Sequence, residues 1–166
     1  MENRDTIIAW LRDAHAMESH AIELLERQGA RLDKFPAFQH RVREHLEESR
    51  GQARRLEDCL KALGTDTSAL KSGMGSLMGN LQALGNTMVG DEAVKGAIAA
   101  YAFEHMEIAS YQVLIAAARD LNLAQVERTC TDNLAEEERM QQWLLDHIPE
   151  ITERYLAEGA RESAKA

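Results

Sequence analysis

The chain has 166 residues, of which 45% are apolar and 28% charged, as in a single globular domain rather than a disordered segment. Its 28 acidic and 19 basic residues give a net charge of −9, which disfavours nucleic acid and anionic membranes as partners. No apolar run approaches the ~20 residues of a membrane span, and the first residues lack a secretion signal, so we expect a cytoplasmic protein. Cys59 and Cys130 lie among apolar residues, and we expect both to be reduced core thiols.

Only two prolines and ten glycines interrupt a chain rich in helix-forming residues, which indicates long helices and no sheet. Apolar residues spaced three and four apart predict four long helices, at residues 5–28, 36–63, 91–120 and 123–147. Asp5 is a suitable cap for the first helix, and Pro36 suits the first turn of the second. Pro149 is expected to end the fourth helix.

The segment between the second and third long helices differs in composition. Residues 64–90 contain six of the ten glycines and three methionines, although leucine and methionine still recur there at helical spacing. We expect a weak helix at 66–89 that forms a long crossover, and a short helix at 150–159 that completes one domain over residues 1–166. Two short hairpins joined by one long crossover are typical of ferritin-like bundles. The predicted fold class is therefore an all-α, ferritin-like four-helix bundle.

Each long helix carries glutamate on or beside its apolar row, near its middle. On the last helix the row predicted to face inward is Val126, Thr129, Asn133, Glu136, Met140, Trp143 and His147. In an antiparallel bundle the glutamates would reach a similar depth, and buried carboxylates without counter-charge are unfavourable by several kcal/mol. Metal ions that prefer oxygen ligands would relieve that repulsion. We therefore predict a site for two metal ions, Fe or Mn, held by Glu18, Glu48, Glu104, Glu107 and Glu136.

Three further side chains are predicted to lie at this site. His45, three residues before Glu48, is either a metal ligand or a core histidine bonded to a carboxylate. Gln52 and Tyr111 each follow a predicted ligand by one turn, and we expect them to donate hydrogen bonds to the ligands. Most other glutamates are expected to lie on solvated helix faces, among them Glu44, Glu47, Glu57, Glu137 and Glu138.

Three short segments, taken in order, resemble a known family. EHLEESRGQ at 44–52, FEHMEIASY at 103–111 and LAEEE at 134–138 resemble the YciE/YciF-type ferritin-like stress proteins of bacteria. The resemblance covers about residues 5–148 and implies a ferritin-like fold, a dinuclear metal site, a homodimer and a role in stress responses. It implies as ligands Glu18, Glu48, Glu107 and Glu136, with Glu104 in support.

The sequence also departs from the usual di-iron pattern. Ferritin-like di-iron proteins carry Glu-x-x-His on two helices, whereas here Gly51 stands three residues after Glu48 and Arg139 three residues after Glu136. Because both histidines are missing, the sequence identifies no catalytic residue and leaves enzymatic activity open. Two main functions remain: a metal protein that reduces peroxide or oxygen or handles metal, and a structural or interaction bundle without redox turnover. A ferritin-type storage cage is a third, although no residue pattern in the sequence indicates cage contacts.

Overall fold

The computed structural model describes residues 2–65 and 92–164, which form four α-helices. Their bounds are α1 Glu2–Gly29, α2 Pro36–Ala62, α4 Glu92–Asp120 and α5 Ala124–Ser163. Within these ranges there is no strand, and no helix is long and apolar enough to cross a membrane. The predicted all-α bundle of four long helices is confirmed, while the crossover helix predicted at 66–89 lies outside the described residues.

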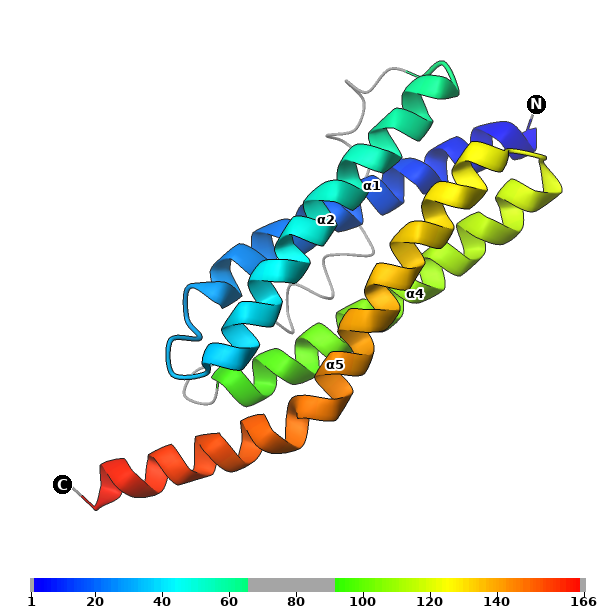
Figure 1. Ribbon diagram of the computed structural model, residues 1–166. Helices are drawn as coiled ribbons and strands as arrows, with labels where there is room; N and C mark the ends of the chain where they lie inside the picture. The colour runs from blue at the N-terminus through cyan, green and yellow to red at the C-terminus, as the bar shows by residue number, and fades with distance from the viewer. Residues whose placement is uncertain (1, 66–91, 165–166) are drawn as a thin grey trace.

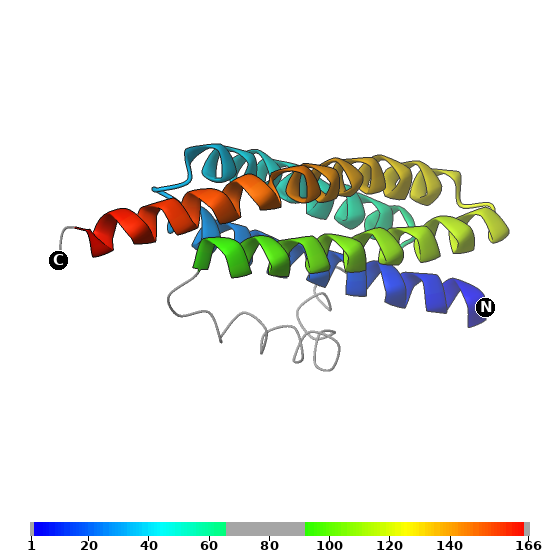
Figure 2. The same cartoon turned by 90° about the horizontal axis from the view of Figure 1, so that it is seen from below.

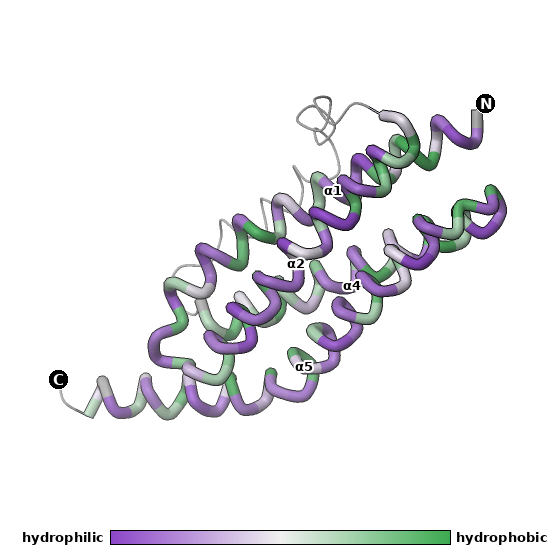
Figure 3. Tube along the Cα trace, turned by 45° about the horizontal axis from the view of Figure 1, so that its top comes forward, coloured by the Kyte–Doolittle hydropathy of each residue, from purple (hydrophilic) through white to green (hydrophobic). Residues whose placement is uncertain are grey.

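The helices pack as two antiparallel hairpins, α1 with α2 and α4 with α5 (Figure 1). Seen from below, α2 and α5 form one layer and α1 and α4 the other (Figure 2), in agreement with the contacts of α2 on α5 and of α1 on α4. Apolar and polar residues alternate along the helices at short intervals (Figure 3), as expected when one face of each helix is buried. The buried faces meet along the axis of the bundle.

The core consists of two apolar clusters with a polar section between them. One cluster packs the first half of α1 against the end of α2, the end of α4 and the start of α5, with Leu11, Leu60 and Leu114 fully buried. The other packs the end of α1 against the starts of α2 and α4 and the middle of α5, with Phe38 and Leu144 at its centre. Nonpolar packing at both ends therefore fixes the depth of the polar residues in the middle.

The C-terminal region differs from the prediction of two separate helices. α5 continues from Ala124 through Pro149 to Ser163 without a break. Proline has no N–H to donate to the carbonyl four residues earlier, and its ring crowds that carbonyl, so a proline either ends a helix or bends it; here α5 bends. Figure 1 shows this bend in the orange part of α5. Ile151 remains buried in the second apolar cluster, which explains why the helix persists beyond the proline.

Candidate metal centre

The polar section of the core is built from all four helices. Eight polar side chains there are at most 3% exposed: Glu18, His45, Ser49, Gln52, Glu104, Glu107, Asn133 and Glu137. Each stands at a position that continues the buried row of its own helix. Helical spacing of three and four residues on four facing helices therefore brings these groups to the same depth.

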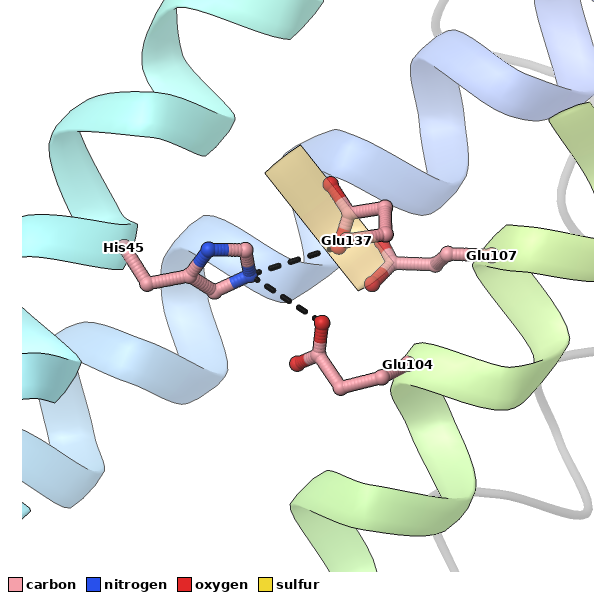
Figure 4. A group of neighbouring side chains, drawn as sticks. All are labelled: His45, Glu104, Glu107 and Glu137. Atoms are coloured by element: carbon pink, nitrogen blue, oxygen red, sulfur yellow. Dashed lines mark ion pairs between the residues drawn. The ribbon is translucent and has the colours of Figure 1, made fainter. Parts of the chain in front are cut away.

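Four of these side chains converge on one point. His45 from α2, Glu104 and Glu107 from α4, and Glu137 from α5 each offer one ligand atom, and these atoms all lie within 4.8 Å of one another. His45 Nε2 lies 3.3 Å from Glu104 Oε2 and 3.4 Å from Glu137 Oε2. Figure 4 shows the imidazole facing the three carboxylates from the opposite side. We call these four residues the His–Glu cluster.

Several atoms of this region have no hydrogen-bond partner within the described residues. They are Glu18 Oε2, Glu104 Oε2, Glu137 Oε2, both carboxylate oxygens of Glu107, His45 Nε2, Ser49 Oγ and Gln52 Oε1. The contacts of His45 Nε2 have the distance of an ion pair but not the alignment of a hydrogen bond. Buried polar groups nearly always find a partner, so a concentration of unpartnered acceptors at one point is unusual. Such a set of buried oxygen and nitrogen atoms is suited to bind a cation.

Glu18 borders the His–Glu cluster from α1. Its Oε1 accepts a hydrogen bond from the Tyr111 hydroxyl, and its charge interacts with those of Glu137 and Glu104. Asn133 Nδ2 donates to the same phenolic oxygen at 2.9 Å. On the other side, Gln52 Nε2 donates to Glu137 Oε1. Gln52 and Tyr111 are thus both hydrogen-bond donors to buried carboxylates, as the sequence suggested.

Burial and mutual repulsion control the protonation of the acids. Burial raises the pKa of Glu104 to about 8. Burial, with the nearby charge of Glu137, also raises the pKa values of Glu107 and Glu18 well above the usual range of a carboxyl. Burial and mutual repulsion therefore favour the protonated form of these three carboxyl groups when no metal is bound.

His45 and Glu137 form the charged pair of the metal-free site. Burial alone would lower the pKa of His45, but the negative charge of Glu104 and contacts with Glu137 and Glu48 raise it well above its ordinary value. Burial likewise opposes ionisation of Glu137, but its contacts with His45 and the hydrogen bond from Gln52 lower its pKa overall. The surroundings thus favour a protonated His45 and an ionised Glu137, and they favour protons on the other acids. Binding of a metal ion would displace those protons.

The structure corrects the assignment of residues on α5. Glu137, which the sequence placed on a solvated face, is fully buried in the cluster, and that prediction was wrong. Glu136 instead lies at the edge of the bundle, where it accepts a hydrogen bond from Arg55 Nη2. The predicted inward row ran through Thr129, Glu136 and Trp143, whereas the buried row runs through Cys130, Glu137 and Leu144.

A signal for the correct row was present in the sequence. Both rows share Val126, Asn133 and Met140, so spacing alone does not separate them. The residues that differ between the two rows distinguish them. Cysteine and leucine, at Cys130 and Leu144, are more often fully buried than threonine and tryptophan, at Thr129 and Trp143. The residue three positions after Glu137 is Met140, so the correction does not restore a Glu-x-x-His motif on this helix.

Glu48, which was predicted to be a metal ligand, lies outside the His–Glu cluster. Its carboxylate lies beside the His–Glu cluster, bonded to His45 Nδ1 at 2.9 Å and to Arg41 Nη2 at 3.0 Å. Burial opposes ionisation, but the bonds from His45 and Arg41 lower the pKa of Glu48 to about 2. The structure therefore brings together Glu18, Glu104, Glu107 and His45 of the predicted ligands, with Glu137 added, and leaves Glu48 and Glu136 outside.

A four-helix bundle with buried carboxylates from α1, α4 and α5 and a histidine from α2 defines a ferritin-like protein with a candidate metal centre. The chain belongs to the family described as "Domain of unknown function (DUF892)", which matches residues 2–157.

Solved structures of similar proteins agree with this assignment. A protein of Xanthomonas campestris pv. campestris is 31% identical, with 95% of this chain and 99% of that chain covered and a TM-score of 0.80. The E. coli stress protein YciF is 23% identical, with coverages of 91% and 97% and a TM-score of 0.78. YcfI of Rhodopseudomonas palustris is 26% identical, with coverages of 86% and 92% and a TM-score of 0.69. The resemblance to YciF-type proteins is thereby confirmed.

Proposed function

We propose that this protein binds Fe or Mn at the His–Glu cluster and serves a stress response through metal handling or through reduction of peroxide or oxygen. The observation that carries the proposal is the convergence of four buried ligand atoms within 4.8 Å of one another. The role in stress is proposed by analogy with the E. coli stress protein YciF, which shares the fold.

The ligand set favours a hard or borderline metal. Three carboxylates and one imidazole are offered, and no thiolate is among them. Carboxylates suit Fe and Mn, and imidazole suits Fe, whereas thiolates would favour softer ions. Because protons on Glu18, Glu104 and Glu107 compete for the same oxygens, metal binding should release protons and strengthen as the pH rises.

We further propose that the site holds two ions. Glu107 has two carboxylate oxygens without a partner among the described residues, and its charge interacts with both Glu18 and Glu137. Glu107 and Glu18 would therefore help to hold a second ion beside the one at the His–Glu cluster. When bound, Fe(II) or Mn(II) would supply the electrons for reduction of peroxide or oxygen, and turnover would need an external reductant to return them. The Tyr111 hydroxyl, which donates a hydrogen bond to Glu18, is the proton donor that we propose, with its proton restored from solvent.

The alternative is a bundle without redox turnover, and one observation favours it. The raised pKa values of Glu18, Glu104 and Glu107 allow protons to neutralise the core, so the fold does not require a metal. The two proposals differ in what purified protein retains. A metal protein keeps Fe or Mn after passage over a desalting column, whereas a structural bundle keeps none.

The test compares neighbouring glutamates of α5. Bound metal per chain is measured by elemental analysis after loading with Fe(II) or Mn(II), for the parent, Glu137→Gln, Glu136→Gln and Glu138→Gln. Glu137→Gln should lose most of the metal, because an amide is a poor ligand and cannot carry the charge. Glu136→Gln should retain the metal, because Glu136 bonds Arg55, and so should the exposed control Glu138→Gln. A parent that binds no metal, or equal losses in all three variants, would refute the proposal.

A further inference from the structure

Glu48 lies next to the His–Glu cluster without joining it, and both of its carboxylate oxygens are engaged by cationic side chains. Oε2 accepts hydrogen bonds from His45 Nδ1 at 2.9 Å and from Arg41 Nη2 at 3.0 Å. Oε1 lies 3.5 Å from Arg139 Nη2, which reaches it from α5. The Glu48 side chain is 23% exposed, so its carboxylate spans the boundary between solvent and the buried histidine. These contacts leave it poorly placed to bind a metal.

The two ring nitrogens of His45 have different surroundings. Nδ1 faces Glu48 on the same helix, three residues further on, whereas Nε2 faces Glu104 and Glu137 on the other hairpin. A carboxylate at Nδ1 favours the tautomer that keeps its proton there, which leaves the lone pair of Nε2 for a metal. The ring itself is 1% exposed, so solvent does not compete for either nitrogen.

We propose that Glu48 is a positioning residue that keeps the proton on Nδ1 of His45 and directs Nε2 into the His–Glu cluster, so that Nε2 is the nitrogen that gives up its proton when a metal binds. Arg41 and Arg139 in turn hold the Glu48 carboxylate from two helices. The predicted effect of Glu48 on metal affinity rests on the proposed function. The orientation of the His45 ring does not depend on whether a metal binds. It also assigns a role to Arg139, which supports the histidine through Glu48 and does not enter the cluster.

Substitutions of Glu48 distinguish a positioning residue from a ligand. Glutamine keeps an oxygen that accepts from Nδ1–H but is a poor metal ligand, whereas leucine removes the acceptor. Affinity for Zn(II) and Mn(II) is measured by competition with a chelator for Glu48→Gln, Glu48→Leu and the ligand variant Glu104→Gln. Glu47→Leu is the control, because Glu47 directly precedes Glu48 on α2 and is exposed.

We expect Glu48→Gln to stay within about tenfold of the parent, and Glu48→Leu to bind about 10- to 100-fold more weakly, as is usual when the partner of a metal-bound histidine is removed. Glu104→Gln should lose more affinity than either, and Glu47→Leu should match the parent. Should Glu48→Gln lose as much affinity as Glu104→Gln, Glu48 is a ligand and the inference is wrong.

The orientation of His45 is measured directly by ¹⁵N NMR of the imidazole, in metal-free and in Zn(II)-loaded protein. The parent and Glu48→Gln should show a hydrogen-bonded, slowly exchanging Nδ1–H, and Glu48→Leu should lose it while circular dichroism reports an intact helix content. If the parent binds no Zn(II), the proposed function fails, and the metal-free spectrum still decides the inference. A parent spectrum without the Nδ1–H signal, or a signal that survives in Glu48→Leu, would overturn it.

Discussion

The hydroxyl of Tyr111, on α4, donates a hydrogen bond to Oε1 of Glu18, on α1. Two neighbouring hydrogen bonds, one from Arg55 to Asn133 and one from Asn133 to Tyr111, fix the direction of this bond. Arg55 Nε donates to Asn133 Oδ1 at 2.7 Å, which turns the Asn133 amide so that its Nδ2 donates to the Tyr111 oxygen at 2.9 Å. The phenolic proton is therefore left to point at Glu18, and Glu18 Oε2 keeps no partner among the described residues.

Substitution Tyr111→Phe should destabilise the metal-free protein by about 1–3 kcal/mol, because it leaves buried Glu18 Oε1 and Asn133 Nδ2 without their partner. The measurement is the free energy of unfolding in urea, in the presence of a chelator. Tyr101→Phe serves as the control, since Tyr101 is only partly buried and packs edge-on against His105. Equal effects of the two substitutions would show that the Tyr111 bond adds no stability.

The rotation of α5 can be tested with two adjacent leucines. Leu144 is fully buried in the second apolar cluster, whereas Leu145 is 47% exposed. Leu144→Ala should cost about 2–5 kcal/mol and Leu145→Ala less than about 1 kcal/mol, as measured by urea unfolding. The reverse order would contradict the placement of Leu144, and with it Glu137, on the buried face of α5.

The stability of the metal-free protein should depend on pH through the cluster. Glu104, with a pKa raised from 4.5 to about 8, and His45, with a pKa raised above 6.5, bind protons more tightly when folded than when unfolded. Their contribution is full at low pH and is lost as the pH rises through the folded-state values. Glu48, whose pKa is lowered to about 2, and Glu137, whose pKa is also lowered, contribute stability that is lost as the pH falls below 4.5.

The free energy of unfolding should therefore be greatest near about pH 5 and decline toward about pH 9 when a chelator is present. With saturating Mn(II) the decline should be reduced, because metal binds the deprotonated ligands and stabilises the folded state more as the pH rises. The measurement is urea unfolding at a series of pH values, with and without metal. A flat profile without metal would show that the acids are not protonated in the folded protein.

The two cysteines should be unreactive in the native protein. Cys59 and Cys130 are at most 1% exposed, and burial raises the pKa of Cys130 to about 12. Because the thiolate is the reactive form, a thiol reagent at about pH 8 should label neither cysteine until the protein is unfolded in urea, when both should react. Rapid labelling of the native protein would indicate that the core opens frequently.

The four long helices and their antiparallel pairing were predictable, because the apolar residues recur at helical spacing over segments of sufficient length. The residues on α4 were predictable for the same reason: Glu104 and Glu107 are three apart and flanked by a single apolar row. The end of the last helix was not predictable from the sequence. Pro149 would usually stop a helix, but here it lies beside Ile151, whose burial keeps the helix intact.

Glu137, the α5 residue of the His–Glu cluster, was missed for a geometric reason. A shift of one residue rotates a helix by about 100°, and the residues 136–138 are all glutamate, so local composition gives no preference among them. Glu48 was misassigned because it lies three residues from His45, and this spacing suits two ligands as well as a ligand and its supporting carboxylate. Only the positions of Arg41 and Arg139 in the folded chain distinguish the two roles.

The cluster lies where the two hairpins meet, and this location affects the order of folding. Glu104, Glu107 and Glu137 belong to the α4–α5 hairpin, whereas His45 and Glu18 belong to the α1–α2 hairpin. Each hairpin can form from contacts near in sequence, which are fast to make. Water is removed from the acids only when the hairpins dock, so docking is the step at which protons or metal must be taken up. The concentration of free metal should therefore change the rate of docking and leave the formation of each hairpin unaffected.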